Sequence, residues 1–385
     1  MKRLPYLLSV LALFIVMQTV SQETYRDVKP DDETLVYKGG DFYPVKMYPQ
    51  QWKGKKPKNI VLLIGDGMGV SHVFAGITAN GGKLFLDNFK HIGFAKTSSS
   101  SHYITDSAAG GTALAAGIKT YNGAIGVDPY KNPVKSILQE AIENGISGGL
   151  VSTSAITHAT PASFIAHQAA RSSYEAIAAD FLKTDIDVFI GGGYKHFTAR
   201  QDGRNLVKEL EAKGYKVLQN MDEIVKVRSG KLAGLTAPEH NGRMEARGNM
   251  LPEASKTAIN ILKNNKKGFF LMIEGSQIDW AGHANNTTFS VEEMLDFDRT
   301  IGEILEFAAA DGQTLVIVTS DHETGGKAIT GGDFKTGMVK AAFPTTDHTA
   351  VMVPIFAWGP GAEEFIGIME NTDVHKKMRK LLLGK

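Results

Sequence analysis

Between Asn59 and Glu323 the sequence contains five short apolar runs, each of which ends in glycine or polar residues. Such runs are typical of buried strands. Four amphipathic segments, at 133–144, 202–213, 251–264 and 291–311, lie between or beside them and predict helices, with Pro133 near the first start and glycines just past several ends. This alternation predicts an α/β fold with a mostly parallel central sheet sandwiched between helices. The runs are NIVLLIGDG (59–67), GGLVSTS (148–154), DVFIGGG (187–193), GFFLMIEGS (268–276) and TLVIVTSDHE (314–323).

The absence of repeats and long linkers favours a single α/β domain over residues 58–385, preceded by a polar arm over residues 22–57. Before the arm, Lys2 and Arg3 precede an apolar run from Tyr6 to Met17. The run is short for a membrane span and is followed by small residues, so residues 1–21 are interpreted as a signal peptide cut after Ser21, in preference to a membrane anchor. We therefore expect a periplasmic or secreted protein with no stable membrane insertion.

Composition argues against nucleic acid as a partner and excludes disulfide bonds. The formal net charge of the 385 residues is +1, which argues against a surface that binds nucleic acid. The chain contains no cysteine, so disulfides cannot stabilise it. Stability must come from the core and, where present, from bound metals.

Polar residues follow the predicted strands at the point where each strand ends. Asp66, Ser154, Glu274 and the pair Asp321 and His322 all occupy such positions. Ligands of open α/β sheets bind beyond the carboxyl ends of the strands. We therefore expect these side chains to meet at one edge of the sheet.

Ser107 lies in the stretch ITDSAAGGTALAAG, between an aspartate and a run of small residues. Alanine and glycine bury little apolar surface, so core volume alone does not account for this stretch. One interpretation is a simple N-cap of a tightly packed helix. The other is a nucleophile at a helix N-terminus, where an anion is also stabilised and the bare helix leaves room for a phosphoryl group.

Carboxylates and histidines in three further segments have the chemistry of metal ligands. Asp279 and His283 are four residues apart and would share one face of a helix. Asp321 and His322 are adjacent in TSDHETGG, and His348 follows in TTDHTA. Oxygen ligands mixed with imidazole suit zinc, whereas all-oxygen ligands suit magnesium. Each segment alone could be a solvated loop, but together with Asp66 they indicate a cluster of metals.

Taken in order, the motifs GDGMG, TDSAAGGTA, HATPASFIAHQAARSS, EGSQIDWAGH, TSDHETGG and DHTA resemble those of the alkaline phosphatases, from about Lys58 to Glu370. The resemblance implies hydrolysis of small phosphate monoesters with a broad range of leaving groups, through a phosphoserine on Ser107, with release of inorganic phosphate. It also implies a homodimer. Arg171 would hold two phosphate oxygens through its planar fork.

The same resemblance implies two Zn²⁺ ions and one Mg²⁺ ion. The implied ligands are Asp279, His283 and His348 for one zinc, Asp66, Asp321 and His322 for the other, and Asp66, Thr160 and Glu274 for magnesium.

Two substrate-site residues depart from the best-known bacterial pattern. His158 stands where that pattern has aspartate, and Trp280 where it has lysine. His158 leaves three alternatives open: a zinc or cobalt ligand at the third site, a residue that holds a water on magnesium, or a packing histidine. Loss of the lysine removes a positive charge near the phosphate.

Three other functions compete with this one. A sulfatase needs Pro and Arg after its reactive residue, whereas Ala108 and Ala109 follow Ser107. A nucleotide phosphodiesterase usually has a threonine nucleophile and lacks the third metal site. A secreted phosphate-binding or metal-binding protein without turnover is excluded only by an assay.

Overall fold

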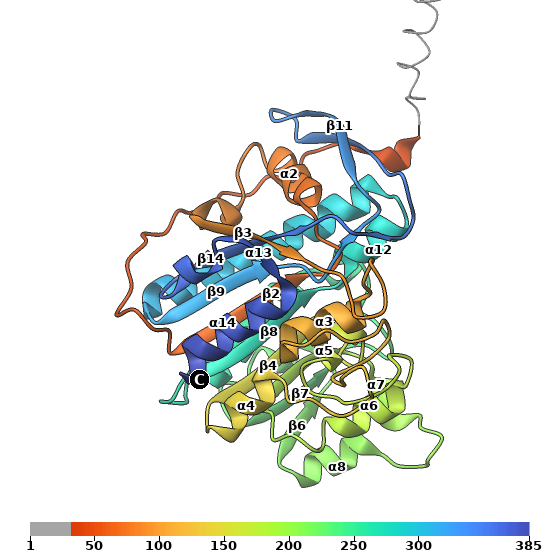
Figure 1. Cartoon of the computed structure of the whole chain (residues 1–385), viewed down its shortest axis with the longest axis vertical. Coiled ribbons are helices and arrows are strands. Elements are labelled where there is room, and N and C mark those ends of the chain that lie inside the picture. Colours follow the sequence, from red (N-terminus) through yellow and green to blue (C-terminus); the bar gives the residue numbers. More distant parts are fainter. Residues whose placement is uncertain (1–31, 385) are drawn as a thin grey trace, which may run out of the picture.

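The computed structural model describes residues 32–384, and a ten-stranded sheet runs through the middle of the molecule (Figure 1). Among these residues, β14 pairs antiparallel with both neighbours, and the other adjacent strands pair in parallel. The expected mostly parallel α/β sheet is therefore confirmed. The strand order is β15 (Gly367–Glu370), β3 (His91–Lys96), β14 (Val353–Trp358), β9 (Thr314–Thr319), β2 (Asn59–Gly65), β8 (Phe269–Gly275), β4 (Ser147–Ala155), β5 (Val188–Gly192), β7 (Lys231–Leu235) and β6 (Tyr215–Leu218).

The five predicted strands are β2, β4, β5, β8 and β9, which lie side by side in the sheet. Alternate residues of β2 enter two different cores: Ile60 and Leu62 pack into one, and Val61 and Leu63 into the other. Side chains of a strand alternate between its faces, so a continuous apolar run is the pattern of a strand covered on both sides.

Helices cover both faces of the sheet (Figure 1). One core receives apolar side chains from α3 (Ser107–Ala116), α4 (Ile137–Glu143), α6 (Tyr174–Asp180), α8 (Leu206–Ala212) and α14 (Asn371–Leu383). The other receives them from α2 (Val70–Ala79), α9 (Met221–Ile224), α11 (Met250–Leu262) and α13 (Thr287–Asp311).

The predicted helix starts were wrong by one to four residues, because short polar caps fix them. Ser136 caps α4 in a capping box with Gln139, so Pro133 lies before the helix and not in its first turn. Asn205 caps α8, so this helix begins later than the apolar pattern indicates. Asn286 caps α13, so that helix begins earlier than the pattern indicates.

The described part of the N-terminal arm packs against its own domain. Its strand β1 (Val36–Tyr37) pairs with β12 (Met338–Ala342), which also pairs with β11 (Ala328–Asp333). The Tyr43 hydroxyl donates to Asp298 Oδ2 at 2.6 Å, and Trp52 packs edge-on against Trp358. The predicted signal peptide at 1–21 lies outside the described residues. Within residues 32–384, no helix combines the length and the apolar character needed to cross a bilayer.

Candidate active site

The site lies at the carboxyl ends of neighbouring strands, as the sequence predicts. Asp66 directly follows β2, Glu274 lies near the end of β8, and Asp321 and His322 follow β9, on either side of β2. The fifth strand-end residue, Ser154, lies next to the last residue of β4, and its Oγ is 3.4 Å from Glu274 Oε2. The parallel register of β2 with β8 and β9 therefore brings residues far apart in the sequence to one edge.

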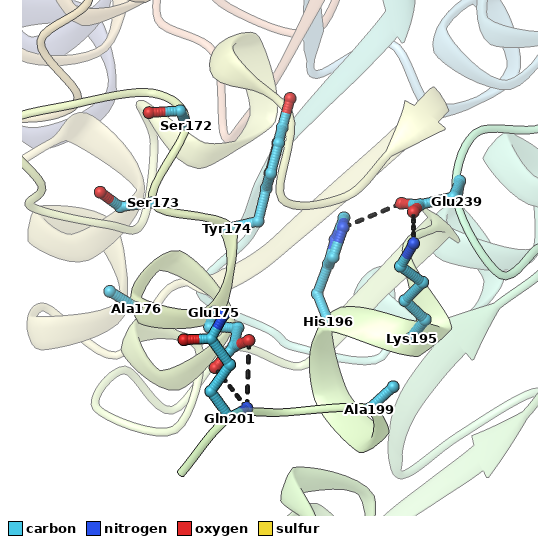
Figure 2. Close-up of a pocket in the computed structure, with 10 residues that line it drawn as sticks. All are labelled: Ser172, Ser173, Tyr174, Glu175, Ala176, Lys195, His196, Ala199, Gln201 and Glu239. Atoms are coloured by element: carbon cyan, nitrogen blue, oxygen red, sulfur yellow. Dashed lines mark hydrogen bonds and ion pairs between the residues drawn. The ribbon is translucent and has the colours of Figure 1, made fainter.

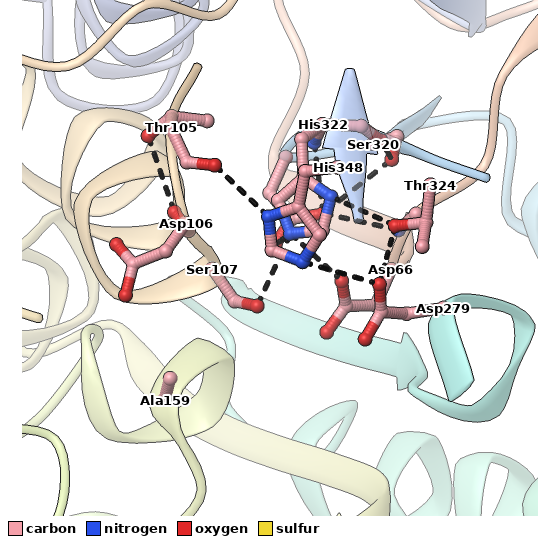
Figure 3. A network of polar contacts seen from close by, with 12 residues as sticks. Asp66, Thr105, Asp106, Ser107, Ala159, Asp279, Ser320, His322, Thr324 and His348 are labelled. Atoms are coloured by element: carbon pink, nitrogen blue, oxygen red, sulfur yellow. Dashed lines mark hydrogen bonds and ion pairs between the residues drawn. The ribbon is translucent and has the colours of Figure 1, made fainter. Parts of the chain in front are cut away.

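Ser107 is the first residue of α3, and Asp106 is the N-cap. Because the Asp106 carboxylate accepts from the Ala109 N–H at 3.0 Å, the interpretation of Ser107 as the cap is wrong. The Ser107 hydroxyl is instead free to face the polar cluster, where its Oγ lies 3.2 Å from His322 Nε2 (Figure 3). The side chain is only 1% exposed.

The small residues of α3 allow it to approach two neighbouring segments closely. A Cβ on Gly110 would lie 3.0 Å from Asp321 Cβ, and a Cβ on Gly111 would lie 3.0 Å from Ser163 Oγ. Ser163 follows α5 (Ala159–Ala162), which carries Thr160. The Ala-Gly composition therefore brings Ser107 and the strand-end carboxylates together.

Asp279, His283 and His348 form the first of three candidate metal clusters, with ligand atoms all within 4.8 Å of one another. The helix α12 (Gln277–His283) places Asp279 and His283 one turn apart, as their spacing predicts. Nδ1 of His283 lies 2.6 Å from the Thr346 carbonyl, and Nδ1 of His348 lies 2.9 Å from the Thr105 carbonyl. Carbonyls accept from Nδ1–H, so in the neutral form of each ring Nε2 carries the lone pair, and the two Nε2 atoms lie 3.2 Å apart.

The second cluster centres on His322, whose Nε2 lies 3.4 Å from Asp66 Oδ1 and 3.4 Å from Asp321 Oδ2. The trio whose ligand atoms all lie within 4.8 Å of one another is Asp66, Asp279 and His322, so Asp279 takes the place that the sequence analysis gives to Asp321. Burial and the neighbouring His348 ring lower the pKa of His322 well below its usual value. A neutral imidazole of this kind suits a metal ligand.

The third cluster contains Asp66, Glu274 and His158. Thr160, the predicted third ligand, lies on α5, and its Oγ1 is buried without a hydrogen-bond partner among residues 32–384. His158 is the N-cap residue of the same short helix. The sequence interpretation left its role open, and the structure brings it to the ligand group.

The donor atoms fit divalent cations. Both Asp66 oxygens, Glu274 Oε1 and Asp321 Oδ2 are buried and have no hydrogen-bond partner in the described part of the chain. Burial raises the pKa of Glu274 to about 7 and of Asp321 to about 6, and burial with the nearby Asp321 raises that of Asp66. Burying several carboxylates together is costly unless cations compensate them, so these orphaned oxygens are what a metal site requires.

Arg171 is oriented by an aspartate that the sequence analysis did not single out. Its Nη1 donates to Asp106 Oδ2 at 3.0 Å, and the Gly123 N–H donates to the same oxygen. Its side chain keeps 30% of its surface exposed, and Nη2 lies 3.4 Å from His158 Nε2. Asp106 therefore caps the helix of Ser107 and holds the arginine; its position directly before Ser107 was the one available signal.

A cluster of three rings flanks the third site. His240 lies edge-on to Trp280, with centroids 4.8 Å apart, and edge-on to His158 at 5.4 Å. The Ala155 N–H donates to His240 Nδ1 at 3.0 Å, which fixes the ring. His240 was missed because no motif of the sequence contains it.

Known proteins resemble this chain over most of its length. A profile of the alkaline phosphatase family matches residues 57–342. Alkaline phosphatase 4 of Bacillus subtilis is 36% identical over 84% of this chain and 88% of its own length. Alkaline phosphatase of Escherichia coli is 32% identical over 85% of this chain and 86% of its own length. The structure of alkaline phosphatase from the Antarctic bacterium TAB5 is 44% identical, covers 86% of this chain and 99% of that chain, and has a TM-score of 0.81. A histidine-to-aspartate variant of it was solved with Mg bound in the M3 site.

The fold, the ligand clusters and these similarities define a metal-dependent phosphoric monoester hydrolase. The chain belongs to the alkaline phosphatase family.

Proposed function

We propose that this protein hydrolyses phosphate monoesters of many alcohols through a phosphoserine on Ser107, with two zinc ions and one magnesium ion. The observation that carries the proposal is the position of the Ser107 hydroxyl, buried and 3.2 Å from His322 Nε2, beside the ligand clusters. Arg171, fixed by Asp106, supplies the group that recognises phosphate.

The proposed ligands follow the clusters. One zinc is held by Asp279, His283 and His348, the other by Asp66, Asp321 and His322, and magnesium by Asp66, Thr160 and Glu274. When bound, these cations lower the pKa of coordinated hydroxyls and neutralise charge on the transferred phosphoryl group.

The chain's own residues have separate tasks. Arg171 binds two nonbridging phosphate oxygens, and the first turn of α3 directs its backbone N–H groups and dipole at the same anion. Ser107 Oγ attacks phosphorus and forms a bond to it as the bond to the leaving-group oxygen breaks. Water then attacks the phosphoserine, which frees Ser107 and releases inorganic phosphate. The buried cluster holds these groups in place, so catalysis is largely electrostatic preorganisation.

His158 lies at the third site, and its imidazole would also suit zinc or cobalt. The TAB5 variant supports the magnesium assignment only for a protein in which a histidine has become aspartate. We propose magnesium here, with His158 acting beside the ion and in the phosphate site with Trp280. Metal analysis of protein refolded with each ion separately tests this assignment.

We also propose that the protein works outside the cytoplasm, in the periplasm or after secretion, as a homodimer. The predicted signal peptide supports export. Cell fractionation and light scattering of the purified protein test the two statements.

The first experiment replaces Ser107 by Ala and measures hydrolysis of a chromogenic phosphate monoester at pH about 9, where coordinated hydroxyls are largely ionised. A loss of at least about 1,000-fold in kcat with unchanged metal content supports the proposal. A parent protein that retains its metals but hydrolyses no monoester would overturn it, and diesters, sulfate esters and phosphate binding would then be tested in turn.

A further inference from the structure

A cavity of about 520 Å³ lies beside the phosphate site, at the starts of α6 and α7 (Tyr194–Thr198). Its wall carries hydroxyl, aromatic and charged groups (Figure 2). The lining includes Ser172, Ser173, Tyr174, Lys195, His196 and Glu239. No step of the proposed mechanism uses these residues.

Chain neighbours connect the cavity to the phosphate site at two places. Arg171 belongs to the phosphate site, and Ser172, the next residue, lines the cavity. His240 packs against His158 and Trp280, and Glu239 before it lines the cavity.

A hydrogen bond makes a third connection. Thr157, the residue before His158, is hydrogen-bonded to His196 Nδ1 at 2.6 Å, and His196 lines the cavity. The cavity wall is therefore joined to the phosphate site by two pairs of chain neighbours and one hydrogen bond.

The cavity offers an aromatic face bordered by hydrogen-bonding groups. The rings of Tyr174 and His196 stack with centroids 4.7 Å apart and 6° between their planes. Figure 2 shows His196 on one side of the Tyr174 ring and Ser172 and Ser173 on the other. The ring is held on its His196 side and can pack against a ligand on its other side.

The charges of the wall disfavour a second anionic group. Glu239 pairs with both Lys195 and His196, with 2.9 Å between its Oε2 and His196 Nε2. Glu175 adds a further carboxylate that accepts from the Gln201 N–H. The only lysine of the lining is thus already matched by a carboxylate, and the second carboxylate has no cationic side chain within the lining.

We propose that this cavity binds the leaving group of the substrate and that it favours a neutral, polyhydroxylated leaving group such as a sugar. A pyranose ring presents an apolar C–H face to Tyr174 and hydroxyls to the polar wall. The inference rests on the proposed function and deepens it. The metals and Arg171 bind the phosphoryl group of any monoester, whereas the cavity makes kcat/KM depend on the alcohol that leaves.

The test compares a hexose 6-phosphate with ethyl phosphate, because both release a primary alcohol and differ mainly in what the cavity can contact. We expect the parent to favour the hexose ester at least about tenfold in kcat/KM, mostly through KM. Tyr174→Ala should bring the ratio close to one, whereas Tyr174→Phe, which keeps the ring, should preserve most of it. A hexuronate 1-phosphate keeps the pyranose ring of the matching hexose 1-phosphate and adds one carboxylate, so it should be cleaved with a much lower kcat/KM than that hexose ester.

The matched control is a pair of lysine variants. Lys195 and Lys135 are 55% and 63% exposed and each pairs with a glutamate, but Lys135 lies at a different cavity. Lys195→Ala should change the ratio and Lys135→Ala should not. A parent ratio near one, or a ratio that Tyr174→Ala leaves unchanged, would overturn the inference while monoester hydrolysis stands. A parent that cleaves neither ester would overturn the proposed function as well.

Discussion

The imidazole rings of His322 and His348 stack almost parallel, with centroids 3.6 Å apart and 18° between their planes. They come from segments that pair as a two-stranded sheet, β10 (Glu323–Thr324) with β13 (His348–Thr349). In that register Glu323 faces Thr349, whose hydroxyl donates to the Glu323 carboxylate. This short sheet therefore fixes the distance between ligands of the two proposed zinc sites.

Thr349→Val removes the hydroxyl bond to Glu323 while keeping the size of the side chain. We expect His348 to be held less firmly and activity in a chelator to be lost about 10-fold faster than in the parent, the scale of effect seen when support for a metal ligand is removed. Thr336→Val is the control, because Thr336 donates to Asp333 at the exposed turn between β11 and β12. Equal rates of loss in both variants would contradict the positioning role.

Trp280→Lys should tighten inhibition by inorganic phosphate, since it adds a positive charge beside the phosphate site. Trp280 packs edge-on against His158, with centroids 6.1 Å apart, so the new ammonium starts close to that site. We expect an inhibition constant lower by about 10-fold, which corresponds to about 1.4 kcal/mol. Trp280→Met controls for loss of the ring alone. An unchanged constant in Trp280→Lys would count against the charge argument.

Removal of the metals should reverse the way stability depends on pH. In the metal-free protein the pKa values of Asp66, Glu274 and Asp321 are raised, the last two to about 7 and 6. A carboxyl with a raised pKa stabilises the fold at low pH, and that stability is lost as the pH rises through the folded pKa. Chelated protein should therefore unfold at lower urea concentration at pH 8 than at pH 5.

The urea midpoint of protein loaded with zinc and magnesium should not fall between pH 5 and pH 8, because the deprotonated carboxylates are the form that binds the metals. Urea midpoints measured with and without chelator at both pH values test this. A chelated protein that is equally stable at pH 5 and pH 8 would refute it.

Lys327 should make the protein more stable as the pH rises above neutrality. Its ammonium is fully buried, donates to Ser290 Oγ at 2.9 Å, and has its pKa lowered to about 7 by burial, against the opposing effect of Glu323. A group with a lowered pKa contributes stability above its unfolded pKa and loses it as the pH falls through the folded value. Between pH about 10 and 7 this contribution should decline by a few kcal/mol.

Lys327→Met removes the titrating group and keeps an unbranched side chain. The difference in urea midpoint between parent and variant should shift in favour of the parent from pH 7 to pH 9.5. A constant difference over that range would show that Lys327 does not titrate there.

Much of this site follows from local sequence patterns. The strand ends at Asp66, Glu274 and Asp321 were predictable, since apolar runs mark the strands and parallel strands share an edge. The turn of helix that joins Asp279 and His283 follows from their spacing.

Other features depend on contacts between distant segments, which no local pattern encodes. Asp106 and Arg171 are 65 residues apart in the sequence, and His240 and Ala155, which share a hydrogen bond, are 85 residues apart. The helix starts failed for a different reason: Ser136 and Asn286 set them through single polar side chains that apolar periodicity does not register. The cavity beside Arg171 likewise forms only when three separated segments meet.

The close approach of α3 at Gly110 and Gly111 also limits how this enzyme can diversify. A side chain added at either position would press on Asp321 or Ser163, so these two positions cannot be changed without disturbing the site. If the cavity selects the leaving group as proposed, preference can vary at its wall, where Ser172, Lys195 and Glu239 are not proposed metal ligands. On the proposed assignment, the chemistry and the choice of substrate belong to parts of the chain that can be altered independently.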